Sequence, residues 1–136
     1  MTENDSKPEE SGPLTEDRIY DAIGSEGITR LVGFFYQQIP ADDILGPMYP
    51  KDDLAGAEER LRLFLIFRFG GPQDYLSLRG HPKLRARHAP FAIPQAARDR
   101  WMLLMENAIQ RCEFRPEVSN VIRSFLSAVA TFLINR

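Results

Sequence analysis

The sequence is poor in cysteine and in long apolar runs, and each shortage argues against a class of protein. Cys112 is the only cysteine, so the chain cannot form an internal disulfide or supply alone the sulfur ligands of a structural zinc or iron–sulfur site. The longest apolar runs span only a few residues, far below the roughly 20 that cross a bilayer. We therefore expect neither a disulfide scaffold nor a membrane-spanning protein.

The chain also lacks a large excess of charge of either sign. Its 17 basic and 19 acidic residues give a formal net charge of -2, and no basic stripe is interleaved with aromatic residues. Because this balance offers no general attraction to phosphate, we expect no nucleic-acid partner. Met1 to Pro13 lacks the basic start and the apolar stretch of a secretory signal, which predicts a cytoplasmic protein with no membrane partner.

The length of 136 residues suits one compact domain. Residues 1–14 combine acidic residues, serine, glycine and proline with little apolar surface, so they predict a disordered acidic tail. We expect the remaining residues, 15–136, to form the single domain.

In the first half of this domain, apolar residues recur at helical spacing. The pattern predicts a first helix from a Thr15 cap to Gly24. A second helix, over 28–39, carries Tyr36 at the edge of its apolar stripe, so that the phenol points inward. Turn-forming residues follow, and they place Tyr49 on a corner.

The second half continues the helical pattern. Asp53 is expected to cap a longer helix that ends sharply at Gly70. Pro82 and Pro90 then confine any helix between them to barely two turns, with His88 near its end. Two longer amphipathic helices follow, with apolar stripes formed by Ala97, Trp101, Leu104, Met105, Ala108 and Cys112, and by Val118, Val121, Ile122, Phe125, Leu126, Val129, Phe132 and Leu133. No alternating run of strand length occurs, so the predicted fold class is all-α.

The common catalytic motifs of hydrolases, zinc proteases and phosphate-binding loops are absent. Two pairs of adjacent carboxylates remain, Asp52 with Asp53 and Glu58 with Glu59. Neighbours on a helix diverge by about 100°. Helix capping and solvation are therefore favoured over a catalytic pair.

The two histidines, His81 and His88, differ in context. Pro82 places His81 in a turn, where a surface or capping role is favoured over a metal-ligand role. His88 lies beside apolar residues at the end of a short helix, where its imidazole could reach a buried planar cofactor. Spacing alone still favours a structural histidine at this position.

Several motifs in one order resemble a known family. They are the stretch from Tyr49 to Leu65 (YPKDDLAGAEERLRLFL), Gly70-Gly71-Pro72, the stretch from Arg79 to Phe91 (RGHPKLRARHAPF), and Arg98-Asp99-Arg100-Trp101. Together they are similar to the truncated hemoglobins of group II, often called hemoglobin O, over about Ile19 to Leu133. Several motifs at consistent spacing are far more specific than any one of them. The resemblance implies a two-over-two helical sandwich, the truncated globin fold, around heme b.

The resemblance also assigns roles to four residues. His88 matches the proximal ligand of the heme iron, and so is the one metal ligand it implies. Tyr36, Tyr49 and Trp101 match the polar residues that stabilise the gas ligand. Phenol and indole groups suit this role because they donate hydrogen bonds to a ligand that acquires partial negative charge.

The heme pocket that the resemblance implies is mostly apolar, and burial of such surface is a large part of heme retention. Its expected lining is Leu54, Ala57, Arg60, Leu61, Phe64, Leu65, Phe69, Arg87, His88, Phe91, Ile93 and Trp101. The small side chain of Ala57 leaves a path toward the iron, while Arg60 and Arg87 suit the heme propionates. One departure is Phe69, where Trp or Tyr is frequent in the family.

The function that this resemblance implies is binding of oxygen, carbon monoxide, nitric oxide or peroxide at a pentacoordinate heme iron. Strong donors near the ligand favour holding and activating it, for nitric oxide or peroxide chemistry, over bulk oxygen transport. Such an enzyme-like activity would need an electron-donating reductase as partner. The alternatives are a gas or redox sensor that acts through a separate protein, and a heme-free helical interaction module.

Overall fold

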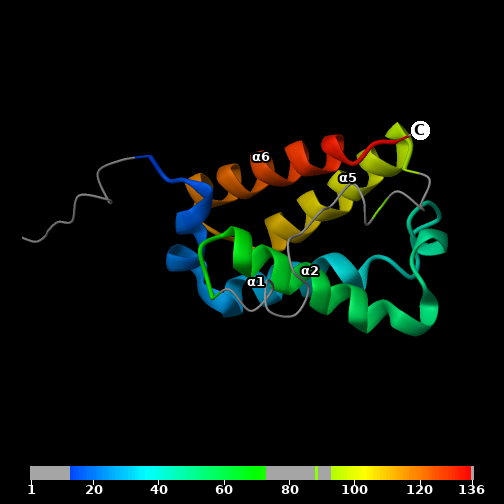
Figure 1. Ribbon diagram of the computed structural model, residues 1–136, viewed down its shortest axis with the longest axis horizontal. Helices are drawn as coiled ribbons and strands as arrows, with labels where there is room; N and C mark the ends of the chain where they lie inside the picture. The colour runs from blue at the N-terminus through cyan, green and yellow to red at the C-terminus, as the bar shows by residue number, and fades with distance from the viewer. Residues whose placement is uncertain (1–12, 73–87, 89–92, 136) are drawn as a thin grey trace, which may run out of the picture.

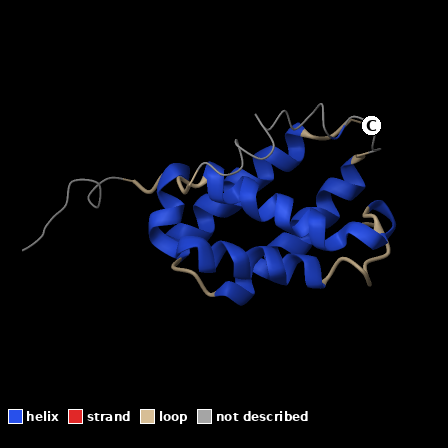
Figure 2. Ribbon diagram, turned by 60° about the horizontal axis from the view of Figure 1, so that its bottom comes forward, coloured by secondary structure: helices blue, strands red, loops and turns tan. Residues whose placement is uncertain are grey.

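The computed structural model describes residues 13–72, 88 and 93–135 of the chain. In these ranges it contains helices, turns and loops and no strand, as Figure 2 shows. The α-helices are α1 (Ile19–Gln37), α2 (Leu54–Arg68), α5 (Gln95–Cys112) and α6 (Pro116–Phe132). Three short 3-10 turns precede or join them: η2 (Glu16–Arg18), η3 (Gly46–Met48) and η4 (Lys51–Asp53). The predicted all-α class is confirmed.

The helices form two layers. In Figure 1, α1 and α2 lie in the lower layer, and α5 and α6 lie in the upper one. Helix α1 packs against both α2 and α5, and α5 packs against α6. This arrangement is the expected two-over-two sandwich. Because α1 contacts α2 in its own layer and α5 in the other, its buried face meets residues of both layers.

Helix α1 joins the two helices that the sequence predicted over its length. The break between them is at Gly24, which has a φ of 69° inside the otherwise helical segment. This left-handed conformation costs glycine little, and the chain resumes its helix directly afterwards. The predicted end at Gly24 is therefore a kink, and it lets Ile19 and Leu31 both reach the core, where each is 0% exposed.

The core follows the predicted apolar stripes. Its largest fully buried side chains come from every layer: Phe35, Phe69, Ile19, Ile28, Leu31, Ile39, Leu45, Leu65, Met105, Ile109, Ile122 and Leu126. Phe132, which the pattern placed on the buried stripe of the last helix, is instead 54% exposed. It is the last residue of α6, so the stripe leaves the covered part of the sandwich there.

Two predicted helix caps are wrong. Thr15 precedes η2, but its hydroxyl donates to the Asp17 carboxylate (2.6 Å) and makes no capping bond. Asp53 stands at the N-cap position of α2, yet its carboxylate accepts from Arg60 (2.9 Å). In each case a nearby side-chain donor or acceptor takes the place of the backbone partner. Leu14, predicted at the end of the tail, packs against the core; residues 1–12 lie outside the described ranges.

The corner between α1 and α2 is fixed by Asp42. Its Oδ2 accepts from the backbone N–H groups of Ile44 (3.1 Å) and Leu45 (2.8 Å). Its Oδ1 accepts from Arg100 of α5 at 2.8 Å, and the side chain of Asp42 is only 7% exposed. An ion pair this well covered, with further hydrogen bonds to its carboxylate, ties the corner to the upper layer. Tyr49 lies on this corner, so its position relative to α5 is constrained.

Helices α5 and α6 are joined by a two-pronged ion pair. The guanidinium of Arg123 donates to both carboxylate oxygens of Glu106, at 2.6 and 2.8 Å. Arg98 adds bonds to Ser127 (2.6 Å) and Thr131 (3.1 Å). Bidentate pairing fixes orientation as well as distance, so the upper layer is a well-defined support for the residues that α5 carries. Within the described ranges no helix combines the length and apolar character that a bilayer crossing requires.

Candidate functional site

The phenol of Tyr36 is buried between the two lower helices. Tyr36 lies near the end of α1 and is 6% exposed. Its hydroxyl donates to the backbone carbonyl of Ala57 on α2, at 3.2 Å. The inward orientation predicted from the apolar stripe is thus found in the structure, and the polar end of the side chain lies beside the first turn of α2.

Tyr49 and Trp101 join Tyr36 from two other elements. The rings of Tyr36 and Tyr49 lie 5.7 Å apart and are perpendicular. Phe35 links the other side, since its ring lies 5.2 Å from Tyr36 and 5.2 Å from Trp101. Such edge-to-face contacts stabilise an aromatic cluster beyond simple burial. The structure therefore brings together the three aromatic residues that the family resemblance singled out, and they come from α1, the corner and α5. We call Tyr36, Tyr49 and Trp101 the polar aromatic trio.

Burial and hydrogen bonding both act on the phenols of the trio. Burial is the main cause that raises the pKa of Tyr36 and of Tyr49 above the ordinary 10.0. The bond between the two phenols raises the pKa of Tyr36 further but lowers that of Tyr49, and the bond from Trp101 also lowers the pKa of Tyr49. The Tyr36 hydroxyl also donates to the carbonyl of Ala57, so a polar network joins the trio to α2.

These pKa directions predict a loss of stability in alkali. Because burial keeps Tyr36 and Tyr49 protonated when folded, the folded chain holds more protons than the unfolded chain above about pH 10. The contribution to stability is fully present below about pH 10 and is lost as the pH rises beyond it. We expect the free energy of unfolding to fall as the pH rises above about 10, and less steeply in Tyr36→Phe. Denaturant titrations check this; an equal slope in both proteins would contradict it.

The lower layer offers an apolar surface next to the trio. On α2, Leu54, Ala57 and Leu61 are only partly buried, although they pack against the core. Phe64, Leu65 and Phe69, further along, are 5%, 0% and 0% exposed. The rings of Phe64 and Phe69 contact Phe125 of α6, with centroids 6.5 and 5.5 Å apart. The first turns of α2 thus present apolar side chains that this chain's own atoms cover incompletely.

Arg60 has an ion-pair partner on the surface. It forms an ion pair with Asp53 (2.9 Å) in which both side chains are about half exposed, 40% and 50%. A surface pair of this kind contributes little to stability, so its guanidinium is available to a competing anion at small cost. The predicted role of Arg60 toward a propionate stays a prediction.

His88 and Ile93 both contact Asn135, which follows α6. His88 is half-buried. The backbone N–H of Ile93 donates to the side-chain oxygen of Asn135 at 2.8 Å. The side-chain nitrogen of Asn135 lies 3.5 Å from the carbonyl oxygen of His88. Arg87 and Phe91, which were predicted to line the same site, lie outside the described residues.

Three contributors to this site were missed from the sequence. Phe35 carries the contact between Tyr36 and Trp101, Arg100 fixes the Tyr49 corner, and Asn135 fixes the His88 segment. Phe35 and Arg100 had been read only as a core residue and as part of a motif. Asn135 gave no signal, because its partners are 42 and 47 positions away in the chain.

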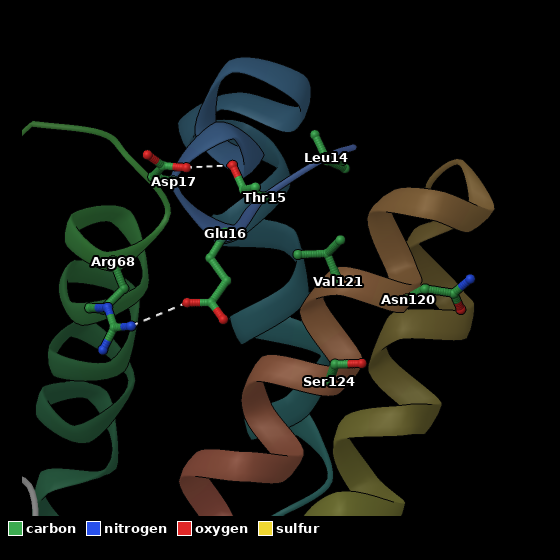
Figure 3. A pocket seen from close by; sticks show the side chains of 8 residues that line it. All are labelled: Leu14, Thr15, Glu16, Asp17, Arg68, Asn120, Val121 and Ser124. Carbon is green, nitrogen blue, oxygen red and sulfur yellow. Dashed lines mark hydrogen bonds and ion pairs between the residues drawn. The ribbon is translucent and has the colours of Figure 1, made fainter. Parts of the chain in front are cut away.

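Two open cavities lie away from the trio. One, of about 610 Å³, opens between η2, the end of α2 and α6, and is lined by Leu14, Thr15, Glu16, Asp17, Arg68, Asn120, Val121 and Ser124. Figure 3 shows its charges occupied with each other, since Glu16 reaches Arg68 (3.2 Å) and Thr15 reaches Asp17. The other, of about 700 Å³, is lined only by residues of α6. Neither has a residue in common with the trio.

Comparison with known proteins identifies the class. A family model described as bacterial-like globin matches residues 18–135. The group 2 truncated hemoglobin YjbI of Bacillus subtilis is 33% identical over 117 residues, which is 86% of this chain and 88% of that protein. The fold is thus that of a small globin. The chain belongs to the bacterial-like globin family and, within it, to the group II truncated hemoglobins.

Solved structures agree with this assignment. The thermostable hemoglobin of the actinobacterium Thermobifida fusca is 42% identical, with a TM-score of 0.84 over 87% of this chain and 97% of that one. The truncated oxygen-avid haemoglobin of Bacillus subtilis is 33% identical, with a TM-score of 0.82 over 87% and 99%. Since these relatives are hemoglobins, the chain is a heme protein that binds oxygen, and ligand binding is favoured over the sensor alternative.

The cofactor of this family is heme b, as the sequence resemblance implied. The described residues fit it in two respects. The incompletely covered apolar surface of Leu54, Ala57 and Leu61 suits a flat tetrapyrrole. The trio next to it offers neutral donors in an apolar surround, which suits a small ligand that gains negative charge.

Proposed function

We propose that this chain holds heme b with the imidazole of His88 as its iron ligand, and retains oxygen for redox chemistry. When bound, ferrous heme supplies a pentacoordinate site for diatomic gases and an electron for their reduction. The observation that carries the proposal is the polar aromatic trio, in which the buried Tyr36 and the partly buried Tyr49 and Trp101 come together from three separate elements. Transport would need easy release, whereas several donors at one point favour retention.

Each residue of the proposed site has a distinct task. Because the Tyr36 hydroxyl donates to the carbonyl of Ala57, we assign to the phenol of Tyr49 the task of stabilising negative charge on a gas ligand. Because burial raises the pKa of both phenols, they remain neutral donors across the physiological range.

The lining residues complete the pocket. Leu54, Leu61, Phe64, Leu65, Phe69 and Ile93 would supply the apolar enclosure, together with Phe91. Ala57 would leave space for entry, since its side chain is a single methyl group. Arg60 and Arg87 would pair with propionates, Arg60 by exchanging its exposed partner Asp53.

The proposed chemistry is oxidation of nitric oxide or turnover of peroxide. In the first, nitric oxide, oxygen and one electron give nitrate, and in the second, peroxide accepts two electrons and two protons to give water. The first needs a reductase to restore the ferrous state and the second needs a donor of the two electrons, so we propose an electron-donating partner and a cytoplasmic site of action. The oxygen-avid character in the name of the Bacillus subtilis relative supports retention of oxygen.

Mixing the oxygenated protein with nitric oxide tests the proposed function. We expect nitrate in a one-to-one ratio to nitric oxide, at a rate that far exceeds spontaneous oxygen release. A parallel assay with hydrogen peroxide and a one-electron donor measures the second activity. Rapid oxygen release with neither reaction would indicate transport and would overturn the proposal.

A further inference from the structure

Asn135 contacts the His88 segment at two points. Its side-chain Oδ1 accepts from the N–H of Ile93 at 2.8 Å, and its backbone N–H donates to the carbonyl of Ile93 at 3.0 Å. The two bonds close a ring between one residue and one backbone position. Its Nδ2 lies 3.5 Å from the carbonyl oxygen of His88. Asn135, which follows α6, thus contacts the backbone of both His88 and Ile93.

These contacts need the chemistry of an asparagine side chain. A primary amide offers an acceptor and two donors on one short stem, and here the acceptor and a donor serve two different backbone groups. Aspartate would keep an acceptor for Ile93 but would set an oxygen against the carbonyl of His88. Leucine, of similar shape, would supply neither partner. The bonds are partly buried, so an unpaired amide or carbonyl left behind would lose solvation as well.

The contacts that join the two upper helices come from other residues. The upper layer is already joined by Arg123 with Glu106 and by Arg98 with Ser127. Asn135 instead joins the end of α6 to a segment that precedes α5. The backbone of His88 is thereby connected to the upper layer of helices.

From this we infer that Asn135 is a positioning residue for the axial ligand: it sets the place of the His88 backbone, and through it the strain in the bond from the imidazole to heme iron. The inference rests on the proposed role of His88. A ligand whose other contacts fix its orientation holds its metal more tightly, and removal of such contacts costs about 10- to 100-fold in metal affinity. Since Asn135 contacts the backbone carbonyl of His88, we expect the lower end of that range.

The test compares Asn135→Leu and Asn135→Asp with the unaltered protein, with Asn120→Leu as a control on the exposed surface of α6. Two readouts concern the heme-loaded protein: the iron–histidine stretching band of the ferrous form and the rate of heme transfer to an acceptor apoglobin. A third, amide hydrogen exchange at Ile93, needs no heme. We expect both Asn135 variants to shift and broaden the stretching band and to lose heme about tenfold faster. Faster exchange at Ile93 is expected in Asn135→Leu only.

The outcomes separate this inference from the proposed function. An unchanged stretching band in both Asn135 variants would overturn it, even if Ile93 exchanged faster, because Asn135 would then only stabilise the fold. A change as large in Asn120→Leu would overturn it as well. If the unaltered protein shows no iron–histidine band at all, the proposed role of His88 fails, and the inference fails with it.

Discussion

Heme bound to His88→Gly is expected to lose the spectral signature of histidine coordination and to dissociate at least about a hundredfold faster. The estimate is a lower bound, because loss of contacts that merely orient a metal ligand already costs about 10- to 100-fold. Apolar burial of the porphyrin should still give some retention, since the surface of Leu54, Ala57 and Leu61 is unchanged. The measurement is the absorption spectrum of the ferric, ferrous and carbon-monoxide forms, together with heme transfer to an acceptor apoglobin.

Added imidazole gives this experiment its specificity. A free imidazole that enters the space left by the His88 ring should restore the spectrum, which a general folding defect would prevent. His81→Gly is the matched control, since it removes the other histidine of the chain and should leave the spectra unchanged. If His88→Gly kept the original spectrum, another residue would have to be the ligand.

The helices could be predicted from the sequence because their periods depend on local composition and on burial. The stripes of α5 and α6 were found correctly, since residues such as Leu104, Ala108, Ile122 and Leu126 repeat at helical spacing. Helix ends were less secure. Asp53 has the residue type of a cap, but Arg60, seven positions on, competes for its carboxylate. Competition of this kind depends on three-dimensional distance and is not visible in a pattern.

The candidate site was predictable only in part, for a related reason. The stripe of α1 shows that Tyr36 points inward, and the stripe of α5 does the same for Trp101. That both meet Tyr49 depends on the corner, whose geometry is set by Asp42 and Arg100 across 58 positions of the chain. Resemblance to a family supplied that convergence, whereas periodicity could not. Neither periodicity nor the family resemblance could predict the role of Asn135, because it belongs to no apolar stripe and to no family motif.

Tyr49→Phe is expected to have the largest effect of any single change in the trio. The hydroxyl proton of Tyr36 is donated to the carbonyl of Ala57, so the phenol of Tyr49 is the donor of the trio that we assign to the ligand. A hydrogen bond to a charged acceptor is worth about 1.5–3 kcal/mol, and each 1.4 kcal/mol changes an equilibrium about tenfold. We therefore expect oxygen to dissociate roughly 10- to 150-fold faster, as measured by stopped-flow displacement with carbon monoxide.

Tyr36→Phe should have a smaller effect, because the Tyr36 hydroxyl donates its proton to the Ala57 carbonyl. Its loss removes one neutral bond to Tyr49, worth about 1 kcal/mol, or roughly fivefold in the dissociation rate. The two changes should not add, since Tyr36 acts on the ligand mainly through Tyr49: in the double variant, Tyr36→Phe should add little. Tyr20→Phe, a change at a phenol of α1 outside the trio, is the control. Full additivity would mean that Tyr36 and Tyr49 contact the ligand independently, and the assignment of the ligand to Tyr49 alone would then be wrong.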